Sequence, residues 1–558
     1  MSFLPFLAAR ERFQPGVHDD MDGASGQKSS AAAFAKRDSW PGSALGPSDR
    51  RIWRIQRIPA HTPKNPMTPR ARRDPGGSPR YSIANWLFLR LLGVVYLFAF
   101  WSLAQQVQLL IGHDGILPAS EYMSEARVWA DGSGIGWDRY RLLPTLFWFG
   151  TSDRFLQAVP VAGAILALFQ IAGVGSILVL PAMWLLYLSL NVVGRDFLSF
   201  QWDALLLEAG VVAIALAPIR WWHRLDDRVD PPRIARWLVW WLLFRLMFGS
   251  GFVKLASGDP SWHNLTALAV HYETQPLPTP VGWLAAQLPR WVQQLSTAVT
   301  LAIELVTPSL IVAGVRARRL AALLFIGLQA LIALTGNYAF FNVLSAALSL
   351  TLLDDNVFQR LVSPAVSLRK VTLVEQGIAI VLALVLIPSS FVVFMRQLGV
   401  VGEARFFQPL VEVVDPLRSA NTYGLFAVMT TTRPEIIVEG SMDGTNWRAY
   451  EFRYKPGSLE RAPRWVAPFQ PRVDWEMWFA ALGRFESEAW FQQFLRRLLA
   501  GSPPVLRMFE YDPFQGRPPR FARGSLYRYR FAPRGDKAWW VRERIGDYSP
   551  PLTLNSPR

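Results

Sequence analysis

Charged side chains interrupt several long apolar stretches of this sequence. Burying a charge among apolar residues is costly, so each one marks either a structural ion pair or a functional polar site. Arg245 and Glu304 should lie at similar depths in neighbouring apolar segments, given a helical rise of about 1.5 Å per residue, and we expect them to pair. The charged residues in apolar stretches are Arg90, Asp203, Glu208, Arg245, Lys254 and Glu304. Glu208, Arg245, Lys254 and Glu304 are the candidates for an intramembrane polar site.

Lys254 follows a run of small residues, Gly249-Ser250-Gly251, near the end of its apolar segment. A lysine held away from water can act as a general base, and His263 or His271 in the next loop would complete a catalytic site. A lysine near a helix end can instead extend its ammonium group to the membrane surface or pair with a carboxylate. The sequence leaves both interpretations open.

Histidines and carboxylates gather in two loops that follow apolar segments. Such side chains bind metals or transfer protons, and the loop residues are His113, Asp114, His263, His271 and Glu273. The spacings H-x-x-x-H and H-E-x-x-H do not occur in the sequence. We therefore predict no metal site.

The last 160 or so residues are dense in aromatic side chains accompanied by arginines. Trp, Tyr and Arg are favoured in protein interfaces, so some of them should form a surface that binds a client protein, although most should be core. The client-binding candidates are Trp465, Arg472, Trp475, Trp478, Phe479, Trp539 and Trp540.

Several classes of chemistry are excluded by what the sequence lacks. It has no cysteine, so disulfides, thiolate metal sites and cysteine nucleophiles are excluded. It also has no Walker A loop, no dinucleotide-binding G-x-G-x-x-G and no G-x-S-x-G elbow. We expect no cofactor, and neither a nucleotide-driven pump nor a lipase of the usual type.

The elements that must position these residues are apolar segments long enough for a bilayer. Although 51% of residues are hydrophobic and only 18% are charged, the mean hydropathy is a modest +0.18, as expected when apolar segments are averaged with polar regions. A helix needs about 20 apolar residues to cross the membrane core. Nine candidate segments occur, at about 85–111, 158–175, 177–193, 203–219, 236–255, 295–314, 319–335, 339–353 and 373–395.

Loop charges predict the orientation of these nine spans. Basic residues favour the cytoplasmic side, and the net charge of +16 is carried largely by the N-terminal tail and by the ends of apolar segments. With the tail inside, the arginine-rich loops at 220–236, 316–319 and 360–370 also fall inside. The C-terminal region then begins outside the cytoplasm. We therefore attribute the basicity to membrane orientation and expect no nucleic-acid partner.

The chain divides into three regions. Residues 1–84 are predicted to be a disordered basic cytoplasmic tail, residues 85–396 a transmembrane helical bundle, and residues 397–558 a soluble extracytoplasmic domain. This last domain is predicted to be α+β with a β-rich core. Strands are expected at 425–432, 435–440, 447–454, 526–531 and 539–543, with a turn at 441–444 and helices at 475–482 and 486–499.

Long stretches of the sequence resemble the lipase maturation factor family, from about residue 85 to residue 552. The matching stretches are HDGILPASEYM (113–123), GRDFLSFQWDALLLEAG (194–210), GSGFVKLASGDPSWHNLTALAVHYETQPLPTP (249–280), NTYGLFAVMTTTRPEIIVEGSMDG (421–444), APFQPRVDWEMWFAAL (467–482) and DYSPPL (547–552). A shorter stretch, FVKLASGDPSWHNLTAL (252–268), is similar to HTTM proteins, which include vitamin K-dependent γ-carboxylases.

The first resemblance implies a multi-pass membrane protein that helps secreted proteins, lipases by family, to fold or assemble. Its implied partners are client proteins and membrane lipids, and relatives in eukaryotes reside in the endoplasmic reticulum membrane. For this chain we expect a bacterial inner membrane, with the C-terminal domain in the periplasm. The second resemblance implies the alternative, a membrane enzyme using Lys254. A transporter is a third, weaker possibility, because no inverted repeat is visible.

Overall fold

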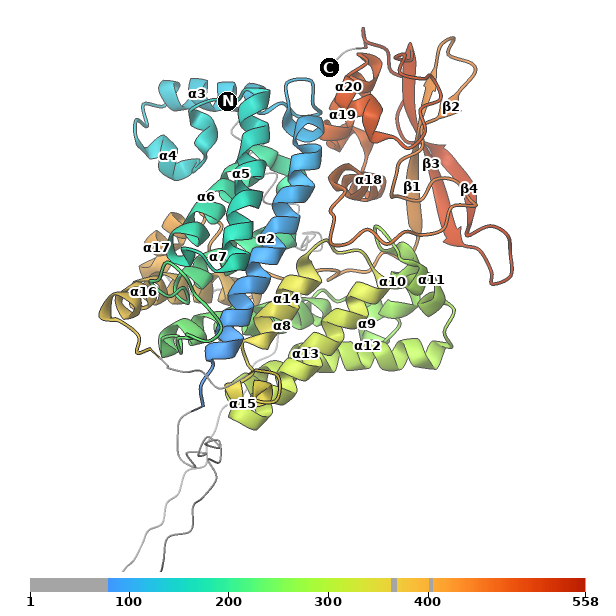
Figure 1. The fold of residues 1–558 in the computed structure, drawn as a ribbon. Helices are drawn as coiled ribbons and strands as arrows, with labels where there is room; N and C mark the ends of the chain where they lie inside the picture. The colour runs from blue at the N-terminus through green and yellow to red at the C-terminus, as the bar shows by residue number, and fades with distance from the viewer. Residues whose placement is uncertain (1–78, 363–368, 401–404, 557–558) are drawn as a thin grey trace, which may run out of the picture. The chain divides into compact units, whose positions relative to one another are not determined.

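Apolar helices form most of residues 82–397, and a small sheet with its own helices follows (Figure 1). The computed structural model describes residues 79–362, 369–400 and 405–556. The predicted tail at 1–84 lies largely outside the described residues, and the first described helix, α2, begins at Ser82. The described residues belong to a single compact unit.

Among the described residues, seven helices of the helical part are long and apolar enough to cross a membrane. They are α2 (Ser82–Ile111), α5 (Asp153–Ala172), α6 (Ser176–Gly194) continued by η2 (Arg195–Leu198), α8 (Arg233–Ala256), α12 (Arg290–Leu305) continued by η3 (Thr307–Ile311), α13 (Val315–Thr335) and α16 (Leu373–Gln397). All nine predicted segments are helical. However, the segments at 203–219 and 339–353 form shorter helices, α7 (Gln201–Ile214) and α14 (Phe341–Leu350).

These two helices are too short to cross a bilayer alone. At about 1.5 Å per residue, 14 and 10 residues span roughly 21 and 15 Å, against a core of about 30 Å. Residues 215–219 after α7 are irregular and include Pro218, and the backbone before α14 is irregular around Ala339, which has a positive φ of 51°. Each of the nine apolar segments therefore contains a helix, but only seven of these helices among the described residues are long enough to be candidate spans, and irregular backbone shortens the other two.

Short helices connect the longer ones. They are α3 (Ala119–Gly132), α4 (Asp138–Leu142), η1 (Leu146–Trp148), α9 (Pro260–His263), α10 (Ala267–Thr274), α11 (Pro280–Ala286), α15 (Asp355–Phe358), η4 (Arg405–Phe407) and α17 (Gln408–Val414).

The starts of α2, α8 and α13 meet the ends of α7 and α14 at one end of the helical part. Ser82 donates a hydrogen bond from its hydroxyl to Asp355, which follows α14. The Tyr81 N–H donates to Asp230 in the loop between α7 and α8, and Arg318 of α13 donates to the Tyr81 hydroxyl. The arginine-rich loops at 220–236 and 316–319 therefore share this end with the start of α2, whereas residues 363–368 of the loop at 360–370 lie outside the described residues.

The C-terminal part is built on a four-stranded antiparallel sheet in the order β2-β1-β3-β4. The strands are β1 (Arg433–Ser441), β2 (Arg448–Ala449), β3 (Phe521–Phe531) and β4 (Trp540–Asp547), and the helices are α18 (Arg472–Leu482), η5 (Phe485–Ser487), α19 (Ala489–Leu499) and α20 (Pro503–Met508). The long central pairing joins Arg433 to Tyr529 and Ser441 to Phe521. An α+β domain was predicted, and this sheet with its helices has that composition.

The predicted strands at 425–432 and 447–454 are largely absent. Residues 425–432 form no strand, because their backbone groups bond to side chains of the helical part instead, and only Arg448–Ala449 of the second segment joins the sheet. The predicted turn at 441–444 is part of a longer loop stabilised by Asp443, whose carboxylate accepts N–H groups from Thr445 and Asn446.

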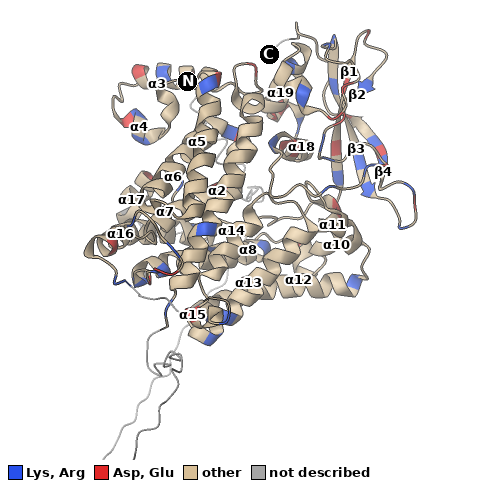
Figure 2. Cartoon of the chain, viewed as in Figure 1, with Lys and Arg blue, Asp and Glu red and all other residues tan. Residues whose placement is uncertain are grey.

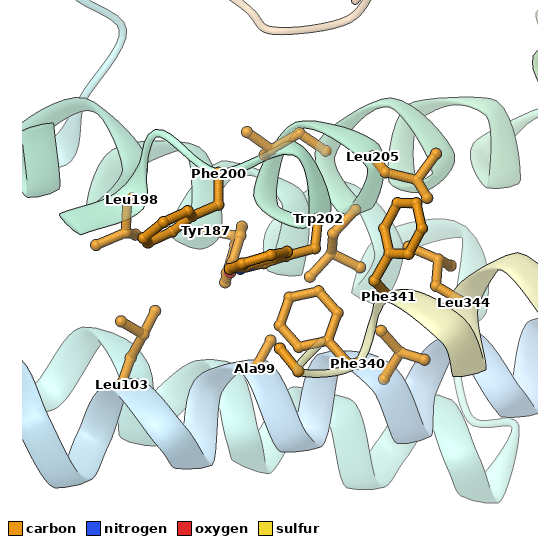
Figure 3. Close-up of a cluster of buried hydrophobic side chains, with 14 of the residues drawn as sticks. Ala99, Leu103, Tyr187, Leu198, Phe200, Trp202, Leu205, Phe340, Phe341 and Leu344 are labelled. Atoms are coloured by element: carbon orange, nitrogen blue, oxygen red, sulfur yellow. The ribbon is translucent and has the colours of Figure 1, made fainter. Parts of the chain in front are cut away.

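One continuous set of buried apolar side chains extends from the helical part into the C-terminal part. Figure 3 shows part of it, where Phe200 and Trp202 face Ala99 and Leu103 of α2, and Phe340 and Phe341 lie to one side. Phe200 and Trp202 stack on each other, and the rings of Trp202 and Trp475 of α18 make a T-shaped contact with centroids 4.7 Å apart. The two parts therefore share one hydrophobic core and are not merely joined by a flexible linker.

Candidate functional site

We use "the seam" for the contacts between the helical part, residues 82–397, and the C-terminal part, residues 419–547. A fully buried ion pair lies at its centre. The Arg472 guanidinium at the start of α18 donates two hydrogen bonds of 2.8 Å to the carboxylate of Asp203 on α7. Tyr187 of α6 also donates to Asp203, and the Phe197 carbonyl accepts from Arg472. Both charges are thus neutralised in a site with no exposed surface.

A second buried charge cluster surrounds Glu208, five residues after Asp203 along α7. Its carboxylate pairs with Arg245 of α8 and accepts hydrogen bonds from the Asn421 N–H at 3.0 Å and the Tyr423 hydroxyl at 2.7 Å. The predicted pairing of Arg245 with Glu304 is therefore wrong. The depth estimate did not fix the rotation of each helix about its own axis, and that rotation directs Arg245 toward α7.

Glu304 pairs instead with Lys254. The ammonium group of Lys254 lies 2.8 Å from both carboxylate oxygens of Glu304, and both side chains are buried. The ring of Trp262 covers the ammonium group at 5.3 Å. Lys254 therefore lies in an ion pair inside the protein. To act as a base it would first have to leave Glu304.

Lys254, His263 and His271, the three residues of the proposed lysine site, have different environments in the structure. His271 on α10 is within hydrogen-bond distance of the Tyr338 hydroxyl, at 2.8 Å, whereas His263 at the end of α9 is exposed. Burial, with the charge of Lys254, lowers the pKa of His271 to about 4, so its ring is neutral near pH 7. Within residues 79–362, 369–400 and 405–556, no three His, Asp or Glu side chains are grouped as metal ligands.

A segment that we call the docking segment, residues 419–432, crosses the helical part in irregular conformation. Its backbone is held by side chains of α7, α8 and the loop that follows. The Met429 N–H donates to Asp259, and the Ala427 and Phe426 carbonyls accept from Ser257 at 2.8 Å and Trp262 at 3.0 Å. These bonds replace the ladder of a β-strand, so the segment belongs to the seam.

Arg433 begins β1 and continues the seam. Its guanidinium donates to the carbonyls of Glu273, Gln275 and Pro276, which end α10 and begin the proline-rich loop. It also pairs with Glu435 at 2.7 Å, and Lys455 pairs with the same carboxylate at 2.9 Å. Since all three charged side chains are buried, the network fixes the sheet on the loop after α10.

Four of the seven predicted client-binding residues are enclosed. Arg472, Trp475, Trp478 and Trp540 are buried, and the Trp478 N–H donates to the Thr274 carbonyl at 2.7 Å. Their positions in the seam and core leave them no surface for a client in this structure. Phe479 and Trp539 are partly buried, whereas Trp465 is 52% exposed.

Trp465 lies in an exposed patch of mixed chemistry, which we call the Trp465 surface. Its neighbour Arg464 donates two hydrogen bonds to Glu510, at 2.8 and 2.9 Å, and Tyr511 follows Glu510 in the chain. Tyr511 is 60% exposed. Two accessible aromatic rings beside an arginine have the composition of an interaction hot spot.

Several seam residues were missed by sequence reasoning because they are neutral. Asn337 donates to the Leu277 and Arg464 carbonyls and accepts from the Val466 and Ala467 N–H groups. Gln106 of α2 donates to the Gln470 carbonyl at 2.7 Å and accepts from the Arg472 N–H. An amide side chain within an apolar segment, like a charged one, indicates a buried polar contact. Including amides among the candidates would have identified Gln106.

Comparison with known proteins matches both parts. The lipase maturation factor transmembrane domain matches residues 83–360, and the lipase maturation factor C-terminal domain matches residues 419–550. Lipase maturation factor 2 of Mus musculus is 34% identical, over 84% of this chain and 83% of the relative. Lipase maturation factor 1 is 33% identical in Mus musculus, over 88% and 92%, and 32% identical in Homo sapiens, over 89% and 93%. No solved structure matches.

Proposed function

The chain belongs to the lipase maturation factor family, and we propose that it is a membrane-anchored maturation factor that assists the folding or assembly of secreted proteins. It is an integral membrane protein with several spans. Secreted lipases are the first candidate clients, because the relatives are named for lipase maturation. The C-terminal domain would cover apolar client surface until the client folds or assembles.

We place the C-terminal domain outside the cytoplasm, in the periplasm if the membrane is a bacterial inner membrane. Support comes from the arginine-rich loops, which lie at the same end as the start of α2, since basic loops favour the cytoplasmic side. Secreted clients emerge on the opposite side. Seven crossings and nine crossings both place the two chain ends on opposite sides, so the assignment is the same whether α7 and α14 both cross the membrane or neither does.

The observation that carries the proposal is the rigid attachment of the C-terminal domain, which leaves the Trp465 surface accessible. The ion pair of Arg472 with Asp203 and the carbonyl contacts of Arg433 order this domain before any client arrives. A surface that is already ordered loses less entropy on binding than a mobile one. Trp465 and Tyr511 then supply apolar contacts, and release would follow as the client buries its own apolar surface.

The experiment measures the specific activity of a secreted lipase expressed together with the full chain. We expect Trp465→Ala/Tyr511→Ala to abolish most of the gain in activity, because hot-spot aromatic residues each contribute about 2 kcal/mol or more to binding. The control is Trp137→Ala/Phe149→Ala, which removes two other exposed rings, 86% and 78% accessible. A photocrosslinker at position 465 should capture the lipase, and one at position 137 should not.

Two results would count against the proposal. If the full chain gives no gain in lipase activity, lipases are not its clients. If both double variants lower the gain equally, the Trp465 surface is not the binding site.

A further inference from the structure

The turn between β3 and β4, with the end of β3, lies beside the start of a candidate membrane span. We call residues 530–539 the tip. Trp539 packs edge-to-face on Trp283 of α11, with ring centroids 5.0 Å apart. Residues 531–533 line a cleft of about 380 Å³ together with Ala286 and Gln287. Since the span formed by α12 begins at Arg290, three residues after Gln287, the tip is held at the level where that span begins (Figure 1).

An exposed apolar stripe begins at the same place. Leu284, Leu288, Trp291, Leu295 and Val299 are between 45% and 66% exposed. The last three are spaced four residues apart along α12, so they share one face of the helix. These side chains are much more exposed than the core side chains, so no other part of the described chain buries the stripe. An apolar face of this kind on a membrane span faces lipid, with the tryptophan at the headgroup level.

Cationic side chains outnumber carboxylates around the tip. Arg530, Arg534 and Lys537 are exposed on the tip, and Arg290 is exposed at the start of α12 (Figure 2). The exposed carboxylates near them are Asp536 in the turn and Glu460, which follows Leu459 where that residue contacts Trp539 and Trp540. Glu273 accepts a hydrogen bond from the Phe531 N–H at 2.9 Å, and burial raises the pKa of its carboxyl group.

We propose that the tip binds anionic lipid headgroups in the leaflet on the side of the C-terminal domain. The apolar stripe would face the hydrocarbon core of the membrane next to the tip. The packing of Trp539 on Trp283 would fix the position of the turn relative to the membrane surface. Arg534 and Lys537 then lie where phosphate groups are found. Each lysine or arginine near an anionic membrane surface contributes about fivefold to binding at moderate ionic strength. This contact is separate from the Trp465 surface and would hold the domain toward the membrane.

The test compares the full chain in nanodiscs of phosphatidylcholine with the full chain in nanodiscs of an equal mixture of phosphatidylcholine and phosphatidylglycerol. The measurement is amide hydrogen exchange of residues 532–539. We expect exchange to be slower by about fivefold or more in the mixture, and the difference to shrink at high salt because the charges are screened. Arg534→Gln/Lys537→Gln should abolish the difference.

The matched control is Arg517→Gln/Arg520→Gln, which removes two exposed arginines just before the opposite end of β3. At about 3.3 Å per residue, the 11 residues of β3 place them roughly 35 Å away from the tip. This variant should keep the wild-type difference between the two membranes. The proposal is overturned if the wild type exchanges equally in both membranes, if the tip variant behaves as the wild type does, or if the control variant loses the difference. Equal thermal unfolding of both variants excludes misfolding as the cause.

Discussion

Buried charges in the seam each have a partner from another part of the chain. Asp203 and Arg472 are 269 positions apart in sequence, and both are fully enclosed. Such pairs contribute little net stability compared with an apolar pair, but removing one partner leaves a buried charge without compensation. The pair therefore specifies how α18 sits on α7.

Replacing one member of this pair should be costly, and replacing both should be less so. We expect Arg472→Met to destabilise the protein by about 3–5 kcal/mol, and Arg472→Met/Asp203→Leu to recover much of that loss. Thermal unfolding in detergent measures both. The control is Arg528→Met, since Arg528 pairs with Glu543 at 3.5 Å on an exposed surface, where a pair contributes about 1 kcal/mol or less. Equal melting of Arg472→Met and Arg528→Met would contradict this account.

At the scale of elements, the docking segment shows how an irregular stretch can be as ordered as a strand. Its backbone groups are satisfied by Asp259, Ser257 and Trp262, so it needs no partner strand. Close approach to α8 is part of this arrangement. A Cβ atom at Gly424 would lie 2.3 Å from Cγ2 of Val253, a side chain whose branching leaves it little freedom to move.

Gly424→Ala should therefore lift the docking segment away from α8. We expect a loss of about 1–3 kcal/mol, which is typical of overpacking, and faster proteolytic cleavage within residues 419–432. Gly377→Ala on α16 is the control, because a Cβ atom there meets nothing within 4 Å. If Gly424→Ala resists the protease as well as the wild type does, close contact with Val253 does not control how firmly the docking segment is held.

At the scale of the whole molecule, the shared core makes the helical part dependent on the C-terminal part. Trp202 packs against Trp475, and the carboxylates of Asp203 and Glu208 take partners from residues 421–472. A chain that ends at residue 418 would expose these groups. Loss of activity in such a truncation would therefore not locate the client-binding surface.

We expect the truncated chain to insert into the membrane, because its apolar segments remain, but to unfold at a lower temperature than the full chain. The measurements are membrane extraction and thermal unfolding in the same detergent. Trp465→Ala serves as the comparison, since an exposed side chain should leave the unfolding temperature unchanged while lowering client activity. A truncated chain as stable as the full one would show that the two parts fold independently.

Local patterns in the sequence were enough to identify the nine apolar segments, the end of the helical part at which the basic loops meet, and an α+β C-terminal domain. Hydropathy and charge are properties of neighbouring residues, and the membrane acts on them locally. The resemblance to the lipase maturation factor family was confirmed over most of the chain.

Only the tertiary structure decided which charges pair, which aromatic rings are enclosed and where the docking segment runs. Arg245 was expected in an intramembrane ion pair, but its partner Glu208 depended on the rotation of α7 and α8. Trp475 and Trp478 have the composition of an interface, but they are covered by residues far away in the sequence. Such contacts depend on several helices at once, because a side chain's partner is fixed by how neighbouring elements pack and not by the spacing along its own segment.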